Sequence, residues 1–190
     1  MRWADQAEQF VQALASPQPT PGGGAAAATA GAMGCALVLM AIETTLKRKS
    51  TPADFGPALQ NAKRLFSNLQ TAFHALARRD AAAYTAYLEA CKLPKEDPAR
   101  LQRMQDTLWT AAIVPADTAS ACLQALEVTH TVQDKIAPVI LSDLLCAQHL
   151  LRGAVACCVE NIHANLKYIT EPKQIAKLKK ILEAYEPNGK

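Results

Sequence analysis

The chain has few aromatic side chains, little net charge and no pattern typical of strands. Only 5% of its 190 residues are aromatic although 50% are hydrophobic, and alanine supplies much of this apolar content. Such a composition favours closely packed helices, and no stretch alternates polar and apolar residues as a half-buried strand does. The net charge of +3 is too small to indicate a nucleic-acid or anionic-membrane partner. We therefore expect neither.

Cysteine pairs of the CxxC type are also missing. Six cysteines lie within apolar helical patterns, namely Cys35, Cys91, Cys122, Cys146, Cys157 and Cys158. The chain opens with Met1-Arg2-Trp3, without the apolar segment of a secretory signal. We therefore expect a cytoplasmic protein with free, buried thiols. We expect no metal site, because the adjacent Cys157 and Cys158 would point in different directions on a helix.

Apolar residues recur at helical spacing along almost the whole chain. We predict helices at about residues 3–15, 24–48, 52–78, 80–92, 98–133 and 138–168, followed by a short helix that begins at Glu171-Pro172. The third helix is expected to end or bend near Arg78-Arg79, and Pro115 is expected to kink the fifth. The length suits a single domain over residues 1–190. The predicted fold class is all-α, a bundle of long antiparallel helices with a central small-residue helix.

The central helix resembles a membrane span in one respect. Residues 25–42 carry no charge and are nearly long enough to cross a bilayer. However, the first half consists mainly of alanine and glycine, which drive insertion weakly compared with leucine or phenylalanine. We therefore expect a fully buried helix and no membrane association.

The most informative segment is SPQPTPGGG, residues 16–24, which leads into this helix. The three prolines stiffen the approach, and the three glycines have no Cβ to keep another group away from the backbone. The first N–H groups of a helix lack internal partners and lie at the positive end of its dipole. The segment is therefore suited to binding a carboxylate, phosphate or carbonyl oxygen. A tight helix crossing that needs small residues explains it equally well.

Three further segments carry motifs in addition to the opening SPQPTPGGGAAAATAGAMGCALVLM. They are DAAAYTAYLEACKLPK from Asp80, LSDL from Leu141 and NIHANL from Asn161. Together the four segments resemble the cyclodeaminase/cyclohydrolase family of folate one-carbon enzymes, whose SPTPGGGS-type opening and small-residue helix are similar to the first. This family includes the C-terminal domain of formiminotransferase-cyclodeaminase and free-standing methenyltetrahydrofolate cyclohydrolases. The four segments occur in the family's order and cover roughly residues 8–170.

The resemblance implies chemistry at a one-carbon unit on N5, or bridging N5 and N10, of tetrahydrofolate. A cyclodeaminase lets N10 attack the formimino carbon and expels ammonia, whereas a cyclohydrolase adds water to the methenyl bridge and opens it to 10-formyltetrahydrofolate. Both reactions need proton transfer and no metal or redox cofactor, so positioned carboxylates suffice. The sequence leaves open which of the two occurs. The resemblance also implies a homodimer, and any formiminotransferase would be a separate protein.

The motifs carry the candidate site residues. Asp143 is the first catalytic candidate and Asp80 the second. Without the resemblance either carboxylate would be interpreted as a helix cap, although at the start of the last long helix this role suits Ser142 better than Asp143. Candidate substrate-binding residues are Gly22, Gly23, Gly24, Lys47, Lys49, Asn161 and Asn165. The two lysines would hold the glutamate carboxylates of folate, or simply mark a solvated helix end. The two asparagines lie one helical turn apart and would bind the pterin ring, or hydrogen-bond between helices.

Other candidates carry less weight. His74 and His149 lie in apolar helical patterns and are expected in the core, whereas His163 is an outside candidate for proton transfer. Tyr84 and Tyr87 flank the Asp80 motif and either stack on a ring or belong to the core.

Three departures from the family pattern bear on the reaction. Ala25 replaces the usual serine, Arg78-Arg79 stand where a second acid is common, and Ala137 lies in a segment that often has an asparagine. Three interpretations therefore remain: an active folate enzyme, a non-catalytic or repurposed folate-binding protein, and a helical assembly subunit without a small ligand.

Overall fold

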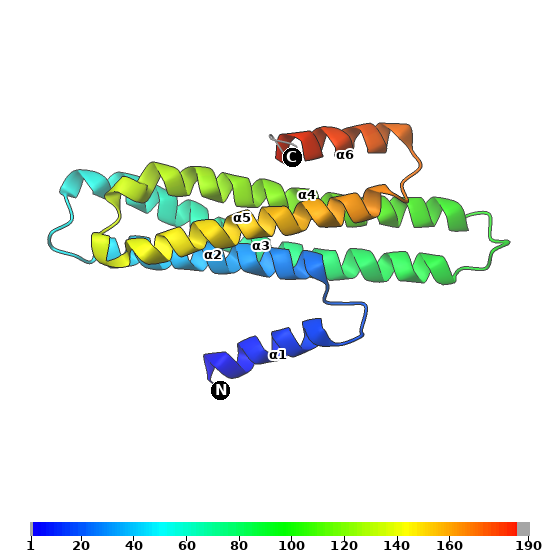
Figure 1. Ribbon diagram of the computed structural model, residues 1–190, viewed down its shortest axis with the longest axis horizontal. Helices are drawn as coiled ribbons and strands as arrows, with labels where there is room; N and C mark the ends of the chain where they lie inside the picture. The colour runs from blue at the N-terminus through cyan, green and yellow to red at the C-terminus, as the bar shows by residue number, and fades with distance from the viewer. Residues whose placement is uncertain (1, 186–190) are drawn as a thin grey trace.

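Four long helices form an elongated bundle in the computed structural model, which describes residues 2–185 (Figure 1). They are α2 (Gly23–Leu46), α3 (Gly56–Lys92), α4 (Arg100–Val132) and α5 (Leu141–Leu166). Each packs against two neighbours, in the cyclic order α2, α3, α4, α5. The shorter elements are α1 (Trp3–Ala15), α6 (Pro172–Tyr185) and the 3-10 turns η1 (Ala53–Phe55), η2 (Gln133–Lys135) and η3 (Pro138–Ile140). The predicted all-α bundle is confirmed.

The small side chains of α2 allow α3 and α5 to approach it closely. A Cβ on Gly31 would lie 2.5 Å from Cε1 of Phe73, and a Cβ on Gly34 would lie 2.9 Å from Cγ of Leu151. Larger residues at these two positions would force the helices apart. The chain itself therefore supplies the close neighbours that these glycines require.

Helix α3 is continuous from Gly56 to Lys92, so the predicted break near Arg78-Arg79 is wrong. No glycine or proline interrupts the chain between Pro57 and Lys92, and the alanines after Asp80 favour helix. Asp80 thus lies in the middle of a helix and is not a cap. Its carboxylate is consequently available for another role.

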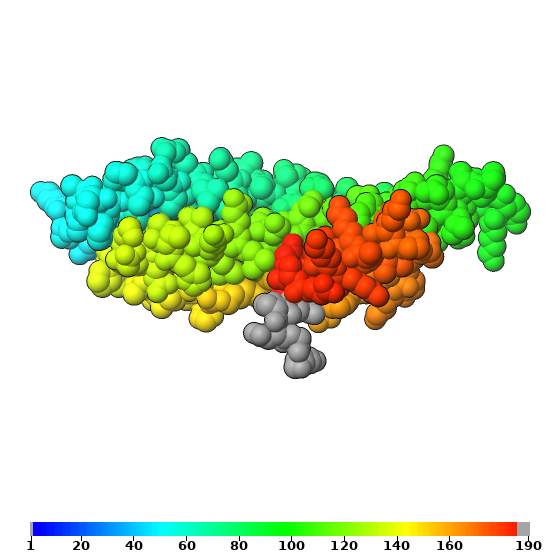
Figure 2. Space-filling view, turned by 90° about the horizontal axis from the view of Figure 1, so that it is seen from above, coloured from blue at the N-terminus to red at the C-terminus, as the bar shows by residue number. Residues whose placement is uncertain are grey.

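Helix α6 turns back over α4 and α5 after the bundle ends. Its Leu178 and Leu182 join Leu108 and Ala112 of α4 and Ile162 of α5 in a second apolar cluster. Figure 2 shows α6 lying across this face of the bundle. The cluster fixes α4 against the last turns of α5, where the site described below is found.

Helix α1 forms as predicted, but its apolar face is not covered by the chain. None of its residues is buried, and Trp3 and Val11 are 82% and 61% exposed. Figure 1 shows α1 apart from the bundle, on the opposite side from α6. The N-terminal amphipathic helix therefore has an apolar face without a partner within residues 2–185.

The cysteines are free but not all buried. Cys35, Cys122 and Cys158 lie in the core, and burial raises the pKa of Cys35 and Cys158 to about 12. Cys146 and Cys157 are exposed on α5. The prediction of buried thiols is wrong for these two because they lie on the outward face of the helix.

Two helical stretches satisfy a length and hydropathy test for membrane spans. They are Gly23–Leu46 and Pro138–Leu166, and 56% and 33% of their most apolar windows are buried in the bundle. The same test is passed by core helices of proteins that never enter a bilayer. The expectation that the central helix is fully buried is wrong, because Met33 and Met40 lie on its outward side and are 55% and 41% exposed. Only 33% of the second window is buried, so α5 also exposes part of its apolar surface.

Candidate functional site: a cleft at the start of α2

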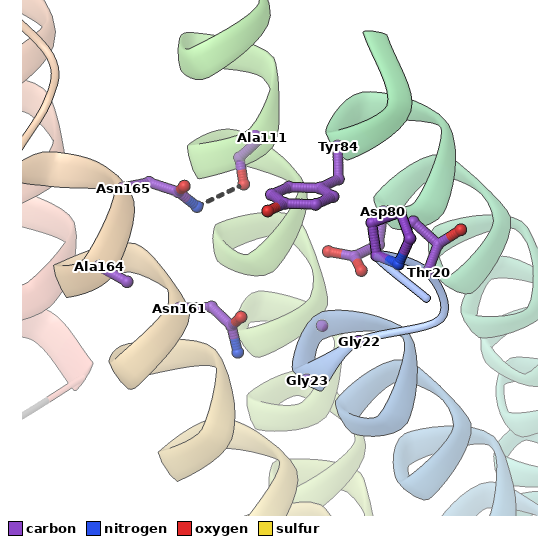
Figure 3. Close-up of a pocket in the computed structure, with 11 residues that line it drawn as sticks. Thr20, Gly22, Gly23, Asp80, Tyr84, Ala111, Asn161, Ala164 and Asn165 are labelled. Atoms are coloured by element: carbon purple, nitrogen blue, oxygen red, sulfur yellow. Dashed lines mark hydrogen bonds between the residues drawn. The ribbon is translucent and has the colours of Figure 1, made fainter. Parts of the chain in front are cut away.

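A cleft of about 270 Å³ opens where α2 begins. Its walls come from the loop before α2 and from α3, α4 and α5 (Figure 3). Gly22, Gly23 and Gly24 all line it. The free N–H groups at the start of α2 therefore lie beside a space in which an electron-rich ligand atom would find donors.

Asp80 contributes a carboxylate to the cleft from the middle of α3. Its pKa is raised above the usual aspartate value because burial disfavours the charged form, and a hydrogen bond from the Ala25 backbone N–H partly offsets this effect. A carboxyl group with a raised pKa exchanges protons more readily near neutral pH than an ordinary surface aspartate. Asp80 is therefore suited to general acid/base chemistry.

Gly24 makes room for the Asp80 side chain. A Cβ at position 24 would overlap Oδ1 of Asp80 and lie 2.8 Å from its Oδ2. Any side chain here would displace the carboxylate from the helix start. Position 24 thus needs glycine because of a close approach by the carboxylate.

Asn161 lies on the opposite wall, against Gly23. A Cβ at Gly23 would lie 3.3 Å from Nδ2 of Asn161, and this Nδ2 already donates to the Cys157 carbonyl at 2.7 Å. Oδ1 of Asn161 has no such bond to its own helix and borders the cleft in Figure 3. The amide thus offers an acceptor to a bound molecule.

Asn165 satisfies a backbone group that a proline leaves unpaired. Pro115 lies inside α4 and has no N–H to donate to the carbonyl of Ala111, four residues earlier. Nδ2 of Asn165 donates to this carbonyl at 3.1 Å, as Figure 3 shows. The interhelical hydrogen bond predicted as one alternative for Asn165 is therefore present, and it fixes the side chain at the cleft.

Among the other cleft residues, Tyr84 is indicated only weakly by the sequence motifs and Ala111 not at all. Tyr84 lies one turn after Asp80 and lines the cleft, with 41% of its surface exposed. Its ring lies 6.4 Å from that of Tyr87, centroid to centroid. Ala111 was missed entirely, although the spacing to Pro115 identifies its carbonyl as one that needs a partner.

Three predicted site residues are not in this cleft. Asp143 lies in the first turn of α5, about 27 Å along the helix from Asn161 at 1.5 Å per residue. Lys47 and Lys49 follow the far end of α2, about 36 Å or more from Gly23 by the same rise. One chain therefore brings Asp80, the three glycines and the two asparagines together, but not Asp143 or the lysines.

The histidines are absent from the cleft walls. His74 and His149 are exposed, so the expectation that they lie in the core is wrong for both. His163 is two residues from Asn161 and thus projects from the opposite side of α5. Among the described residues, no group of three or more His, Cys, Asp or Glu side chains could hold a metal ion.

Residues at the three departures from the family pattern make contacts within the chain, although the backbone contacts of Ala25 and Ala137 do not explain why alanine stands there. Arg79 pairs with Asp117 of α4 at 3.2 Å, with both side chains about half exposed. The N–H of Ala137 donates to Oγ1 of Thr45 at 3.0 Å. Ala25 contacts Asp80 through its backbone N–H, which does not depend on a hydroxyl side chain.

A family profile described as formiminotransferase-cyclodeaminase matches residues 6–184. The chain belongs to this family. Methenyltetrahydrofolate cyclohydrolase from Methylorubrum extorquens is 32% identical over 167 residues, which cover 84% of this chain and 78% of that protein. The family match covers nearly all of the residues that the structure describes, and every residue that lines the cleft lies within it.

Bifunctional relatives are longer. Formimidoyltransferase-cyclodeaminases from Mus musculus and Gallus gallus are 33% and 30% identical over 85% and 86% of this chain. The chain matches about a third of their length, 30% and 31% respectively. A crystal structure of formiminotetrahydrofolate cyclodeaminase from Thermotoga maritima has the same fold, with a TM-score of 0.84 at 24% identity over 98% of this chain and 89% of that one.

Proposed function

We propose that this family member acts on the one-carbon bridge of a tetrahydrofolate, with hydrolysis of 5,10-methenyltetrahydrofolate as the leading reaction. The observation that carries the proposal is the buried Asp80 carboxylate at the glycine-rich start of α2, facing Asn161 across the cleft. The cyclohydrolase relative favours hydrolysis, because it is 32% identical with 78% of its length covered, whereas the cyclodeaminase that is matched over 89% of its length is 24% identical.

Asp80 is proposed as the general base and then the general acid. It accepts a proton from the water that adds to the methenyl carbon. It returns that proton to N5 as the carbon–N5 bond breaks. The hydroxyl proton of the tetrahedral carbon leaves to solvent as the formyl C=O of 10-formyltetrahydrofolate forms, so one proton is released for each cationic methenyl bridge that is opened. One group can perform both transfers when its pKa is shifted toward the working pH, as burial does here. No metal or redox cofactor is needed for these steps.

The rest of the cleft would position the substrate. The Asn161 oxygen and the first N–H groups of α2 supply an acceptor and donors, which suit the alternating polar edge of a pterin. Tyr84 provides an aromatic surface beside them for the flat ring. The substrate-binding roles of Gly22, Gly23, Gly24, Asn161 and Asn165 remain predictions.

Cyclodeamination is the second candidate, favoured by the fold neighbour of that name. It forms the same type of tetrahedral carbon between two nitrogens, with the proton delivered to departing ammonia. In that case a separate formiminotransferase would supply the substrate. The same cleft and the same carboxylate would serve.

Near-ultraviolet absorbance of the methenyl chromophore distinguishes these reactions. Purified protein is added to 5,10-methenyltetrahydrofolate and, separately, to 5-formiminotetrahydrofolate. Faster loss of absorbance in the first mixture identifies a cyclohydrolase, and faster gain with ammonia release in the second identifies a cyclodeaminase. If neither rate changes, binding of the same compounds separates a non-catalytic folate binder from an assembly subunit.

A further inference from the structure

The cleft at the start of α2 has room for only part of a folate. Its volume of about 270 Å³ lies below the range of about 300–1,000 Å³ usual for small-molecule sites. The pterin and its one-carbon bridge would fill it, so the aminobenzoyl and glutamate groups attached at N10 must lie outside. The inner end is closed, because Ala28 and Cys158, one turn deeper than Gly24 and Asn161, are fully buried.

The outer end of the cleft opens along α3 and α5, which run in the same direction. Tyr84 and Asn165 follow Asp80 and Asn161 by one turn and line the cleft beside them (Figure 3). Beyond this turn α5 ends at Leu166, whereas α3 continues to Lys92. Figure 1 shows the α3–α4 hairpin projecting past the start of α2 and the end of α5. A group that leaves the cleft here would therefore lie against the projecting part of α3.

Three tyrosines gather at this outer end. The rings of Tyr84 and Tyr87 lie 6.4 Å apart, centroid to centroid. The pKa of Tyr87 is raised mainly by a side-chain hydrogen bond with Cys91 and by burial, with smaller contributions from Tyr168 and Tyr84, so the three hydroxyl groups are neighbours. Tyr168 is 66% exposed. The outer end thus offers an aromatic surface on which a second ring could stack.

The backbone that carries Tyr168 is fixed to α4. Nε2 of Gln105 donates to the Tyr168 carbonyl at 3.1 Å, and Oε1 of Gln105 accepts from the N–H and the hydroxyl of Thr170 at 2.9 and 3.1 Å. Between them, Ile169 is buried in the second apolar cluster. The segment is therefore held by its backbone and by Ile169, and the Tyr168 ring is left exposed on a rigid support.

Lys167 supplies a cation at the same place. It is exposed and follows Ala164, a cleft residue, by three positions, so it lies about one turn further along the same side of α5. It forms no ion pair with another described residue. The helix dipole also favours a lysine at a helix C-terminus, but that effect does not depend on a ligand.

Charge favours this exit over the side of the cleft formed by the loop before α2. Residues 3–46, which include that loop, contain three acidic residues and no lysine or arginine. A carboxylate that left the cleft on that side would meet no cation there. Lys167 provides one at the end of α5, and the tail of a folate is anionic.

We propose that the outer end of the cleft binds the aminobenzoyl-glutamate tail of the substrate, with the Tyr168 ring stacked on the aminobenzoyl group and Lys167 paired with a glutamate carboxylate. This inference rests on the proposed function, which places only the pterin and its bridge. It replaces the sequence-based assignment of this role to Lys47 and Lys49, which follow the other end of α2. Both residues act on substrate binding and not on the reacting carbon.

A pair of substrates tests the role of Lys167. The N-methylamide of 5,10-methenyltetrahydropteroate keeps the bridge and the aminobenzoyl ring of 5,10-methenyltetrahydrofolate but has no carboxylate. Lys167→Gln should raise KM for the folate roughly two- to fivefold, as the loss of an exposed ion pair does, and leave KM for the amide and both kcat values unchanged. High salt should raise the folate KM of the wild type more than that of the variant.

The matched control is Lys179→Gln, which removes the same charge from the exposed side of α6 and should change neither KM. An unchanged folate KM in Lys167→Gln, or equal changes for the folate and the amide, would overturn the pairing of Lys167 with the tail.

The role of Tyr168 is tested with the same two compounds. Tyr168→Ala should raise both KM values roughly three- to tenfold, because both compounds keep the ring, whereas Tyr168→Phe should stay near the wild type. Since the Tyr168 carbonyl and not its side chain bonds to Gln105, Tm should change little. An unchanged KM in Tyr168→Ala, or a loss confined to kcat and Tm, would overturn stacking.

Equilibrium binding separates this inference from the proposed reaction. If the wild type turns over neither compound, the proposed function fails, and isothermal titration calorimetry then compares the dissociation constants of the same two compounds. A preference for the folate that Lys167→Gln removes and Lys179→Gln retains would still support the tail site. Equal dissociation constants in the wild type, or no binding of either compound, would overturn it.

Discussion

At the residue scale, the cleft depends on the contact between a glycine and a carboxylate. Gly24 lets Asp80 reach the start of α2, where the Ala25 N–H holds it. The contact joins segments more than 50 residues apart in the sequence. It thus explains why a glycine-rich motif and an aspartate motif occur together in one chain, which neither motif explains alone.

Gly24→Ala should reduce activity by at least about 100-fold, because general acid/base catalysis contributes roughly 10²–10⁴ and the new Cβ displaces the Asp80 carboxylate. Steady-state kinetics with the methenyl substrate measures this loss. Gly56→Ala is the matched control, since a Cβ at position 56 meets nothing within 4 Å. Equal activities of the two variants would show that the overlap at position 24 has no consequence.

Asp80→Asn should leave the protein at least as thermally stable as the wild type at neutral pH. Burial raises the pKa of Asp80, so its contribution to stability is fully present below the ordinary value of about 3.9 and is lost as pH rises through the raised pKa. The asparagine variant stays neutral and should not lose this contribution. Tm measured between about pH 4 and 8 should therefore fall further with rising pH in the wild type. A steeper fall in the variant would contradict the direction of the pKa shift.

At the scale of elements, a side-chain hydrogen bond from α5 to α4 replaces a backbone hydrogen bond that α4 lacks. Pro115 leaves the Ala111 carbonyl unpaired, and Asn165 supplies the donor. Both Ala111 and Pro115 are buried, so water would not readily replace this bond. The proline in one helix thus determines the orientation of an amide at the cleft wall of another.

A double-mutant cycle tests this coupling. Asn165→Ala should destabilise the protein by about 1–3 kcal/mol, because a buried carbonyl loses its donor. In the Pro115→Ala background, residue 115 regains an N–H that can bond to the Ala111 carbonyl, so the same change should cost clearly less. Urea unfolding of the four proteins gives the coupling energy. Equal effects of Asn165→Ala in both backgrounds would mean that Asn165 does not replace the bond lost at Pro115.

The ends of helices could be predicted where a proline or glycine stands at or near the end. Prolines and glycines mark the starts of α2 and α6 and the end of α3. The predicted break at Arg78-Arg79 was wrong because two arginines do not interrupt a helix that an alanine-rich segment continues. The exposure of Cys146, Cys157 and His149 could not be predicted, since all six cysteines lie in similar apolar patterns and their orientation depends on bundle geometry.

At the scale of the whole molecule, the sequence predicted the fold class and most of the residues that line the cleft. Gly22 to Gly24, Asp80, Asn161 and Asn165 were all selected from motifs, and the bundle brings them together. The separation of Lys47 and Lys49 from them follows from the predicted helix over residues 24–48, which places the lysines at its other end. The separation of Asp143 could not be predicted, because the wrong break at Arg78-Arg79 added one helix between α2 and α5 and so reversed the expected direction of α5. In one chain the cleft lies at the start of α2 and near the end of α5, and Asp143 and the two lysines lie at the other ends of these helices.

The most direct test compares wild type, Asp80→Asn and the control Asp117→Asn for turnover of 5,10-methenyltetrahydrofolate. Asp117 is about half exposed and pairs with Arg79, so its loss should change the rate little. Asp80→Asn should lower kcat by roughly 10²–10⁴-fold, and circular dichroism should show that the variant remains folded. A folded Asp80→Asn protein with the wild-type rate would contradict the assignment of this carboxylate to proton transfer.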